Sequence, residues 1–256
     1  MISANDNRQL KNITLLMKNR QARSEQRAFV IEGPKMFLEA PKEKIKSIFV
    51  SETFERENCR MLEEYGEYEV VTDKRFSALC DTKTPQGIIA ISEMPKWDRE
   101  AILSGENPLI LILENIQDPG NIGTMIRTSL AACADAVFVS KGSVDIFNPK
   151  VVRSTMGAVY RIPVFTDENI QKLLAELSDR GITSYAAHLE ATESCFDKDF
   201  KKGTAFIIGN ESNGITDETA ESAGEKIIIP MSGEANSLNA AISAGVLLYE
   251  AVRQRR

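Results

Sequence analysis

Short apolar runs alternate along this chain with longer stretches in which apolar residues recur every three or four positions. The runs predict strands and the longer stretches predict helices, because side chains repeat every two residues in a strand and every 3.6 residues in a helix. In the first part of the chain the predicted strands are 29–33, 45–50, 68–71 and 88–91, and the predicted helices are 5–23, 35–40, 53–65 and 73–79. This alternation indicates a small α/β module over residues 1–95.

Residues 96–106 are the predicted linker, because the stretch around them contains Pro95, Gly105 and Pro108, several charges and weak apolar patterning. The alternation resumes in a second predicted domain, 107–256. Its predicted strands are 109–113, 136–139, 162–165, 183–186, 205–208 and 226–229, and its predicted helices are 121–132, 149–156, 170–179, 217–221 and 239–253. Apolar strands between amphipathic helices indicate an α/β fold with a mostly parallel sheet covered on both faces.

The composition is that of a soluble globular protein, with 43% hydrophobic and 27% charged residues. No apolar run approaches the roughly 20 residues of a membrane helix, and the N-terminus lacks a signal-type apolar core, so we expect a cytoplasmic protein. The four cysteines include no CxxC pair, and His188 is the only histidine. We therefore expect no metal site, and we interpret His188, in the strand-like segment Ser184–Leu189, as a structural residue.

Basic residues concentrate near the N-terminus of a chain whose net charge is −6. Between Arg8 and Arg27 there are six Lys or Arg residues against Glu25 alone. This run, with Arg20, Arg23 and Arg27, is consistent with a local phosphate-contacting surface on an acidic body. A solvated helix face explains the run equally well, so the charge pattern alone leaves both interpretations open.

Two strand-to-helix junctions of the second domain carry polar side chains just after buried strands. The first contains the turn Asp118-Pro-Gly-Asn121, in which Asn121 can cap the next helix, and Arg127 follows about two turns later. The second contains Gly209, which permits close approach of a ligand, and Glu211. Ligands of open α/β sheets lie beyond the carboxyl ends of the strands, where both junctions are expected.

A third junction runs from Ile227 to Asn239 and is rich in backbone donors. The helix after it is built of small and apolar residues, so the loop is a good place to hold an adenosine-sized ligand. A fourth segment, 148–157, places Lys150, Arg153 and Ser154 on one short helix as phosphate or ribose contacts. Each junction alone has an ordinary structural explanation, but three at one sheet edge favour a binding site.

Together these motifs resemble those of the SpoU (TrmH) family of RNA ribose 2′-O-methyltransferases, within the SPOUT superfamily. Motif one corresponds to residues 115–127, motif two to 209–214 and motif three to 229–239, and the resemblance is close over 107–256. The first part is similar to the family's L30e/L7Ae-like substrate-binding domain, in the segments Arg27-Ala-Phe-Val-Ile-Glu-Gly33 and Thr84-Pro-Gln-Gly-Ile-Ile-Ala90. The departures are Asn236, where Glu is frequent, and Ala240-Ala241, where Val-Ser is frequent.

The resemblance implies a C-terminal trefoil knot, a homodimer, and S-adenosylmethionine (SAM) as methyl donor without a metal. It implies cofactor contacts by five residues, Gly209, Ile229, Met231, Ser237 and Leu238. It implies a catalytic group made of Arg127, Asn121, Glu211 and Asn239, and RNA contacts by Arg20, Arg23, Arg27, Lys150, Arg153 and Ser154. The expected reaction is 2′-O-methylation of a ribose in structured RNA, with 23S rRNA favoured.

Three alternatives remain from the sequence: a tRNA 2′-O-methyltransferase, a non-catalytic RNA-binding or ribosome-assembly factor, and an ordinary nucleotide-binding α/β enzyme. The absence of a GxGxxG fingerprint argues against the last. The combination of Arg127, Glu211 and Asn239 argues against a factor without activity. Whether Arg127 acts as a base or stabilises an alkoxide also stays open at this point.

Overall fold

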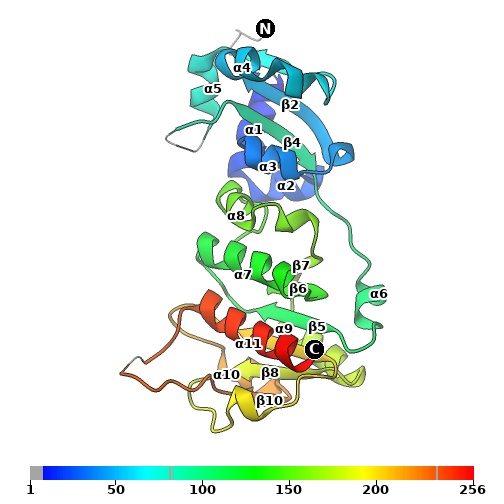
Figure 1. Cartoon of the computed structure of the whole chain (residues 1–256), viewed down its shortest axis with the longest axis vertical. Helices are drawn as coiled ribbons and strands as arrows, with labels where there is room; N and C mark the ends of the chain where they lie inside the picture. Colours follow the sequence, from blue (N-terminus) through cyan, green and yellow to red (C-terminus); the bar gives the residue numbers. More distant parts are fainter. Residues whose placement is uncertain (1–7, 81, 83, 235) are drawn as a thin grey trace. The chain divides into compact units, whose positions relative to one another are not determined.

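The computed structural model describes residues 8–80, 82, 84–234 and 236–256, and Figure 1 labels most of its helices and strands. The chain packs into two compact units, Met1–Pro95 with Phe147–Tyr160, and Lys96–Ile146 with Arg161–Arg256. The segment Phe147–Tyr160 therefore packs in the first unit, although the sequence before and after it belongs to the second. The predicted linker packs with the second unit.

The first unit is built on a four-stranded sheet in the order β1-β4-β2-β3, in which β4 is antiparallel to both neighbours and β2 is parallel to β3. Its strands are β1 (Ala28–Glu32), β2 (Ile45–Ser51), β3 (Glu69–Val71) and β4 (Ile88–Glu93). Its helices are α1 (Arg8–Lys18), α2 (Arg20–Gln26), α3 (Pro34–Glu39), α4 (Glu52–Glu63), α5 (Asp73–Leu79) and α8 (Pro149–Thr155). Short 3₁₀ turns lie at Lys42–Lys44 and Ala158–Tyr160.

The predicted helix 5–23 is two helices, because Asn19 interrupts it. The Asn19 side chain accepts a hydrogen bond from the backbone N–H of Ala22 at 2.9 Å and so caps α2. Asparagine is among the preferred N-cap residues because its side chain satisfies an amide that the helix leaves unpaired. The predicted start of the helix at residue 5 lies outside the described residues.

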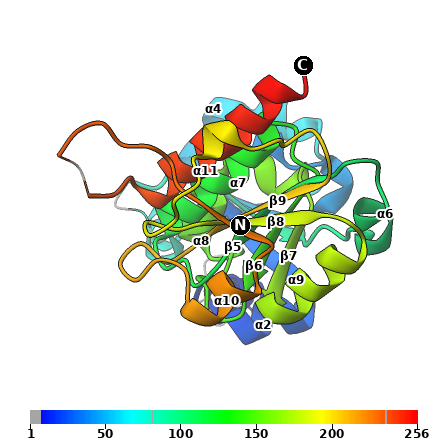
Figure 2. The same ribbon diagram turned by 90° about the horizontal axis from the view of Figure 1, so that it is seen from below.

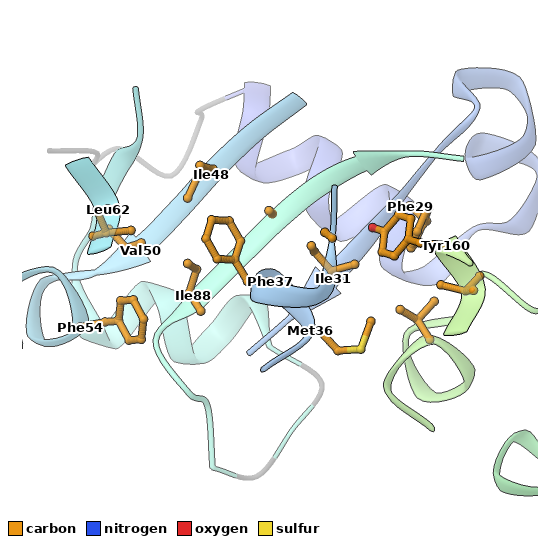
Figure 3. Close-up of a cluster of buried hydrophobic side chains, with 14 of the residues drawn as sticks. Phe29, Ile31, Met36, Phe37, Ile48, Val50, Phe54, Leu62, Ile88 and Tyr160 are labelled. Carbon is orange, nitrogen blue, oxygen red and sulfur yellow. The ribbon is translucent and has the colours of Figure 1, made fainter. Parts of the chain in front are cut away.

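Tyr160 joins the segment Phe147–Tyr160 to the core of the first unit (Figure 3). Its ring centroid lies 5.6 Å from that of Phe29, and its hydroxyl donates to Ser92 Oγ at 2.7 Å. Burial raises the pKa of the Tyr160 phenol, although the bond to Ser92 opposes this effect. The inserted segment thus supplies core residues to a unit from which it is distant in sequence.

A buried ion pair holds α8 in the same unit. The carboxylate of Glu32, at the end of β1, is only 3% exposed, and its Oε2 lies 3.1 Å from Nη1 of Arg153. The hydroxyl of Thr82 donates to the other carboxylate oxygen. Arg153 therefore neutralises a carboxylate that would otherwise be buried without a cation.

The second unit is a six-stranded sheet in the order β10-β8-β9-β5-β6-β7, and every neighbouring pair is parallel, which confirms the predicted sheet. Its strands are β5 (Leu109–Leu113), β6 (Ala136–Ser140), β7 (Val164–Glu168), β8 (Thr183–Ala187), β9 (Thr204–Ile208) and β10 (Glu225–Ile227). Its helices are α6 (Arg99–Leu103), α7 (Pro119–Ala131), α9 (Ile170–Asp179), α10 (Asp217–Ser222) and α11 (Ala240–Gln254), with a 3₁₀ turn at Cys195–Asp197. In Figure 2, α7 and α11 cover one face of the sheet, and α9 and α10 cover the other.

Strand β7 was predicted at 162–165 but begins at Val164 and ends at Glu168. Pro163 has no N–H to give to the ladder, although its carbonyl accepts from the N–H of Val137 at 2.9 Å, and the paired residues therefore begin at Val164. The strand then continues into polar residues because it is at the edge of the sheet, where polar side chains remain solvated.

The predicted linker contains helix α6, which Arg99 fastens to the second unit. Its guanidinium lies 2.6 Å from Glu168 and 2.6 Å from Glu176, and it stacks over the ring of Phe138 at 4.9 Å. The partners of Arg99 lie on β6, β7 and α9, far from the linker in sequence. The composition of the linker alone therefore could not predict these contacts. The trefoil knot stays a prediction. No helix in the described part of the chain is long and apolar enough to cross a bilayer.

Replacing Arg153 by Ala should lower the free energy of unfolding by about 3 kcal/mol, because Glu32 is left as a buried carboxylate without its cation. Urea unfolding followed by circular dichroism measures this change. Lys150→Ala, on the exposed side of the same helix, is the matched control and should change the value by less than about 0.5 kcal/mol. Equal effects of the two variants would show that the ion pair does not anchor α8.

Candidate functional site

The carboxyl ends of all six strands of the second unit meet at one edge, because the strands are parallel. The junction after β5 carries motif one, the junction after β9 carries motif two, and the connection from β10 to α11 carries motif three. Strand β9 is hydrogen-bonded to β5 on one side and to β8 on the other, and β8 pairs with β10. The three predicted junctions therefore share one edge, as expected for a ligand site in an open α/β sheet.

Helix α7 is capped by Asp118, whereas the sequence suggested Asn121 for this role. The Asp118 side chain accepts from the backbone N–H of Asn121 at 2.7 Å, and Pro119 occupies the first helical position. Proline is favoured there because its missing N–H would be unpaired in any case. Asn121 lies in the first turn, and its side chain is left to contact the other motifs.

Glu211, from motif two, accepts three hydrogen bonds from motif one. Its carboxylate receives the backbone N–H groups of Gln117 at 3.2 Å and Asp118 at 3.1 Å, and the Nδ2 of Asn121 at 3.0 Å. Partial burial acts to raise the pKa of Glu211, but these donors favour the ionised form and hold the pKa below its usual value. Glu211 is therefore an anionic acceptor at neutral pH that ties the two loops together.

Asn239 extends this arrangement to motif three. Its Nδ2 donates to Oδ1 of Asn121 at 3.1 Å, while its own Oδ1 accepts from the N–H groups of Ala241 and Ile242 and caps α11. An unbroken hydrogen-bond chain therefore runs from Asn239 through Asn121 to Glu211. The structure brings together three of the four predicted catalytic residues.

Arg127, the fourth, lies six residues after Asn121 on α7, which is roughly 9 Å further along the helix axis. Its side chain is exposed and, in the part of the chain that the structure describes, makes no hydrogen bond or ion pair. Helix α11 packs along α7, and a Cβ on Gly245 would lie 3.8 Å from Thr128. The Arg127 guanidinium is thus an exposed positive charge on α7, which packs against α11, and no carboxylate of the described residues pairs with it.

A pocket of about 440 Å³ opens at the same sheet edge. All five predicted cofactor-binding residues line it, namely Gly209, Ile229, Met231, Ser237 and Leu238. Its walls come from the junctions after β8, β9 and β10 and from the start of α11. Figure 2 shows the described part of the β10–α11 connection projecting from this unit, and most of its residues after Met231 are exposed.

Gly209 was expected to allow close approach of a ligand, and the structure shows that it also allows close approach of the chain's own backbone. A Cβ at this position would lie 2.1 Å from the backbone carbon of Gly214, so the chain's own loop makes the close approach. Asn210 closes that loop: its Oδ1 accepts from the N–H groups of Ser212 and Asn213, and its Nδ2 donates to Asn115 O at 2.8 Å. The glycine shapes the motif-two wall of the pocket before any ligand is considered.

His188 also lines the pocket, and the interpretation as a purely structural residue overlooked this position. It follows directly on the last residue of β8, which is the carboxyl end of a strand next to β9 and β10. The sequence does place His188 just after a predicted strand. This position indicates a binding site only when β8 is seen to lie between β9 and β10, the strands that lead into motifs two and three.

The six predicted RNA-contacting residues differ in how far they are exposed. Arg20, Arg27 and Lys150 are exposed. Arg23 is buried, and its guanidinium donates to the carbonyl oxygens of Leu16 at 2.5 Å and Met17 at 3.2 Å, so it satisfies the last turn of α1.

Arg153 and Ser154 are engaged within the first unit. Arg153 pairs with Glu32, and the hydroxyl of Ser154 donates to Val151 O at 2.7 Å. Among the described residues there is no group of three or more His, Cys, Asp or Glu side chains arranged to hold a metal ion.

Two family models match the chain. The model of the SpoU rRNA methylase family matches residues 108–249, and the model of the MRM3-like substrate-binding domain matches residues 7–90. The first match includes all three motifs of the sheet edge. The second covers most of the first unit without its inserted segment.

Among curated proteins, the chain is similar to the Bacillus subtilis protein named 23S rRNA (guanosine(2553)-2′-O)-methyltransferase RlmP. The two are 33% identical over 235 residues, which are 91% of this chain and 92% of the relative. Among solved structures, it is similar to an AdoMet-bound rRNA methyltransferase from Sinorhizobium meliloti, with a TM-score of 0.83, 29% identity and coverage of 98% of this chain and 97% of the other. A TrmH/SpoU tRNA-modifying enzyme from A. aeolicus matches 61% of this chain and 81% of its own, with a TM-score of 0.52 and 28% identity.

Proposed function

The chain belongs to the SpoU rRNA methylase family, and on this basis we propose that it transfers a methyl group from SAM to a ribose 2′-hydroxyl of 23S rRNA. The observation that carries the proposal is the pocket at the carboxyl edge of the second sheet, next to the hydrogen-bond chain Asn239–Asn121–Glu211. The names of full-length relatives support the reaction and the RNA. Action on ribosomal RNA also supports the cytoplasm as the place of activity.

The pocket suits the chemistry of SAM. Its volume of about 440 Å³ lies in the range of roughly 300–1,000 Å³ that is usual for small-molecule sites. Ile229, Met231 and Leu238 offer apolar contacts to a purine, and the backbone near Gly209 offers hydrogen-bonding groups. When bound there, SAM supplies a methyl group activated by its sulfonium.

Arg127 then acts on the RNA. A ribose hydroxyl is a poor nucleophile, so the enzyme has to favour the oxygen as it loses its proton. A guanidinium remains protonated in proteins, and it is therefore better suited to stabilise a developing alkoxide or to hold a phosphate than to accept a proton. Asn121 and Asn239, immobilised through Glu211, would position the start of the α7–α11 layer beneath the ribose.

Replacing Arg127 by Ala should abolish methyl transfer and leave SAM affinity within about twofold of the wild type, because Arg127 does not line the pocket. Single-turnover transfer from labelled SAM and calorimetric titration measure the two quantities. Lys172→Ala, an exposed cation on α9, is the control and should retain activity. Activity of the Arg127 variant near that of the control would refute the role.

The extent of the structural matches favours rRNA over tRNA as the substrate. The structure described as an rRNA methyltransferase covers 98% of this chain, whereas the tRNA-modifying enzyme covers 61%. A tRNA 2′-O-methyltransferase and a non-catalytic assembly factor are the alternatives. Mapping 2′-O-methyl groups in rRNA and tRNA from cells with and without the gene separates all three.

The first unit is proposed to bind the RNA, with Arg20 and Arg27 as its exposed cations near β1. Replacing Arg20 by Gln and Arg27 by Asn should reduce the slope of log affinity against log salt by about 0.7–0.9 for each phosphate that the variant no longer neutralises. Asparagine suits position 27 because the residue there has a φ of 46°. Filter binding to 23S rRNA fragments at several salt concentrations measures the slope, and Lys172→Gln is the control. An unchanged slope would exclude these two residues.

A homodimer is proposed because one face of α11 and the loop before it leave apolar side chains uncovered. Ile242 and Tyr249, seven residues apart on that helix, are 57% and 51% exposed, and Leu238 is 38% exposed. Residues seven apart share one face of a helix, so a second copy could cover all three at once.

Replacing Ile242 and Tyr249 together by Glu should convert the dimer to a monomer in sedimentation velocity and reduce methyl transfer. Leu38→Glu, an exposed leucine on α3 of the first unit, should leave the dimer intact. A wild-type chain that sediments as a monomer would contradict the dimer directly.

A further inference from the structure

His188 occupies a position in the pocket that none of the three motifs includes. It is the only histidine of the chain, it directly follows β8, and its backbone N–H donates to Ile227 O at the end of β10. That bond fixes the backbone at His188 against the strand that leads into motif three. The imidazole therefore borders the pocket from a rigid element rather than from a free loop.

A hydrogen bond within the loop sets the tautomer of this imidazole. The backbone N–H of Glu190 donates to Nδ1 of His188 at 3.3 Å, so Nδ1 is an acceptor and a neutral ring carries its proton on Nε2. The remaining ring nitrogen is thus a donor. It is one of few side-chain donors on a wall whose other nearby members, Leu189, Ile228 and Ile229, are apolar.

The charges around the pocket decide which part of a ligand this donor suits. Three acidic residues, Glu190, Glu211 and Asp217, line the same pocket, from the β8 loop, the motif-two loop and the start of α10. They disfavour the carboxylate of an amino acid near His188, whereas they tolerate a neutral nucleoside, whose ring nitrogens and ribose oxygens accept hydrogen bonds.

We propose that His188 contacts the nucleoside part of SAM by donating its Nε2–H, and that it contributes to cofactor affinity rather than to the chemical step. The inference rests on the SAM site proposed above. It adds a cofactor-contacting side chain from the junction after β8, between the strands that lead into motifs two and three.

The single histidine makes a direct spectroscopic test feasible. In protein labelled with ¹⁵N-histidine, the only imidazole should show the Nε2–H tautomer, and its Nε2 resonance should shift on addition of SAM and of 5′-methylthioadenosine, which lacks the amino-acid part. An Nδ1–H tautomer, or an Nε2 resonance that neither ligand shifts, would overturn the proposal.

Matched variants test the energetic contribution. His188→Phe keeps a ring but removes the donor, and it should weaken binding of both SAM and 5′-methylthioadenosine by about three- to tenfold, the effect of one net hydrogen bond. His188→Gln places an amide N–H near the position of Nε2 and should restore most of the affinity. The turnover rate at saturating SAM should be unchanged in both variants, while the KM for SAM rises in the Phe variant only.

The control is Thr192→Ala, an exposed position in the same connection that does not line the pocket. Loss of SAM affinity without loss of 5′-methylthioadenosine affinity would place the contact at the amino-acid end and refute the proposal. Wild-type affinity in the Phe variant, while wild-type protein binds SAM and methylates RNA, would refute this inference alone. Wild-type protein that binds no SAM would refute both this inference and the proposed function.

Discussion

The proposed site depends on the two hydrogen bonds made by the side-chain amide of Asn121. Its oxygen accepts from Asn239 and its nitrogen donates to Glu211, so a single residue links motif one to the other two motifs. An amide can do this because it carries a donor and an acceptor on one planar group, whereas a carboxylate could only accept. The geometry also depends on the cap made by Asp118, which occupies the helix terminus and leaves the Asn121 side chain available. Without the Asn121 side chain, motif two would keep its bonds to the backbone of motif one, but Asn239 would lose its link to motif one, so ordering motif three would cost more entropy.

The segment Phe147–Tyr160 means that neither unit is one continuous stretch of sequence. The segment leaves the second unit after β6, supplies Tyr160 and the cation of Arg153 to the first unit, and returns to the second unit before β7. A chain cut at the predicted linker would leave this apolar segment without the core that covers it. The proposed division of labour between RNA binding and methyl transfer is therefore better examined with single substitutions in the whole chain than with isolated domains.

Residue type and charge pattern were informative about the presence of a site but not about each side chain's environment. The basic run near the N-terminus correctly drew attention to Arg20 and Arg27 as exposed cations, yet Arg23 within the same run is buried against the last turn of α1. Arg153 looked like a phosphate-contacting cation on a short helix, but it pairs with Glu32, which is 121 residues away in sequence. The apolar segment around His188 predicts a structural histidine, but the position of β8 in the sheet is what puts His188 in the pocket. In each case the deciding contact is long-range, and local patterns cannot show it.

The order of helices and strands, the parallel character of the second sheet and the family motifs could all be predicted from the sequence, because they depend on local periodicity and short segments. Through the resemblance to the family, the motifs also pointed to five residues that line the pocket, among them Gly209, Ile229 and Leu238, but not to His188. The strand order, the placement of the segment Phe147–Tyr160 and the partners of Arg23, Arg99 and Arg153 could be seen only in the folded chain. The reason is that strand neighbours and buried ion pairs are selected by the free energy of packing distant parts of the chain together, whereas periodicity reports only which face of each element is apolar.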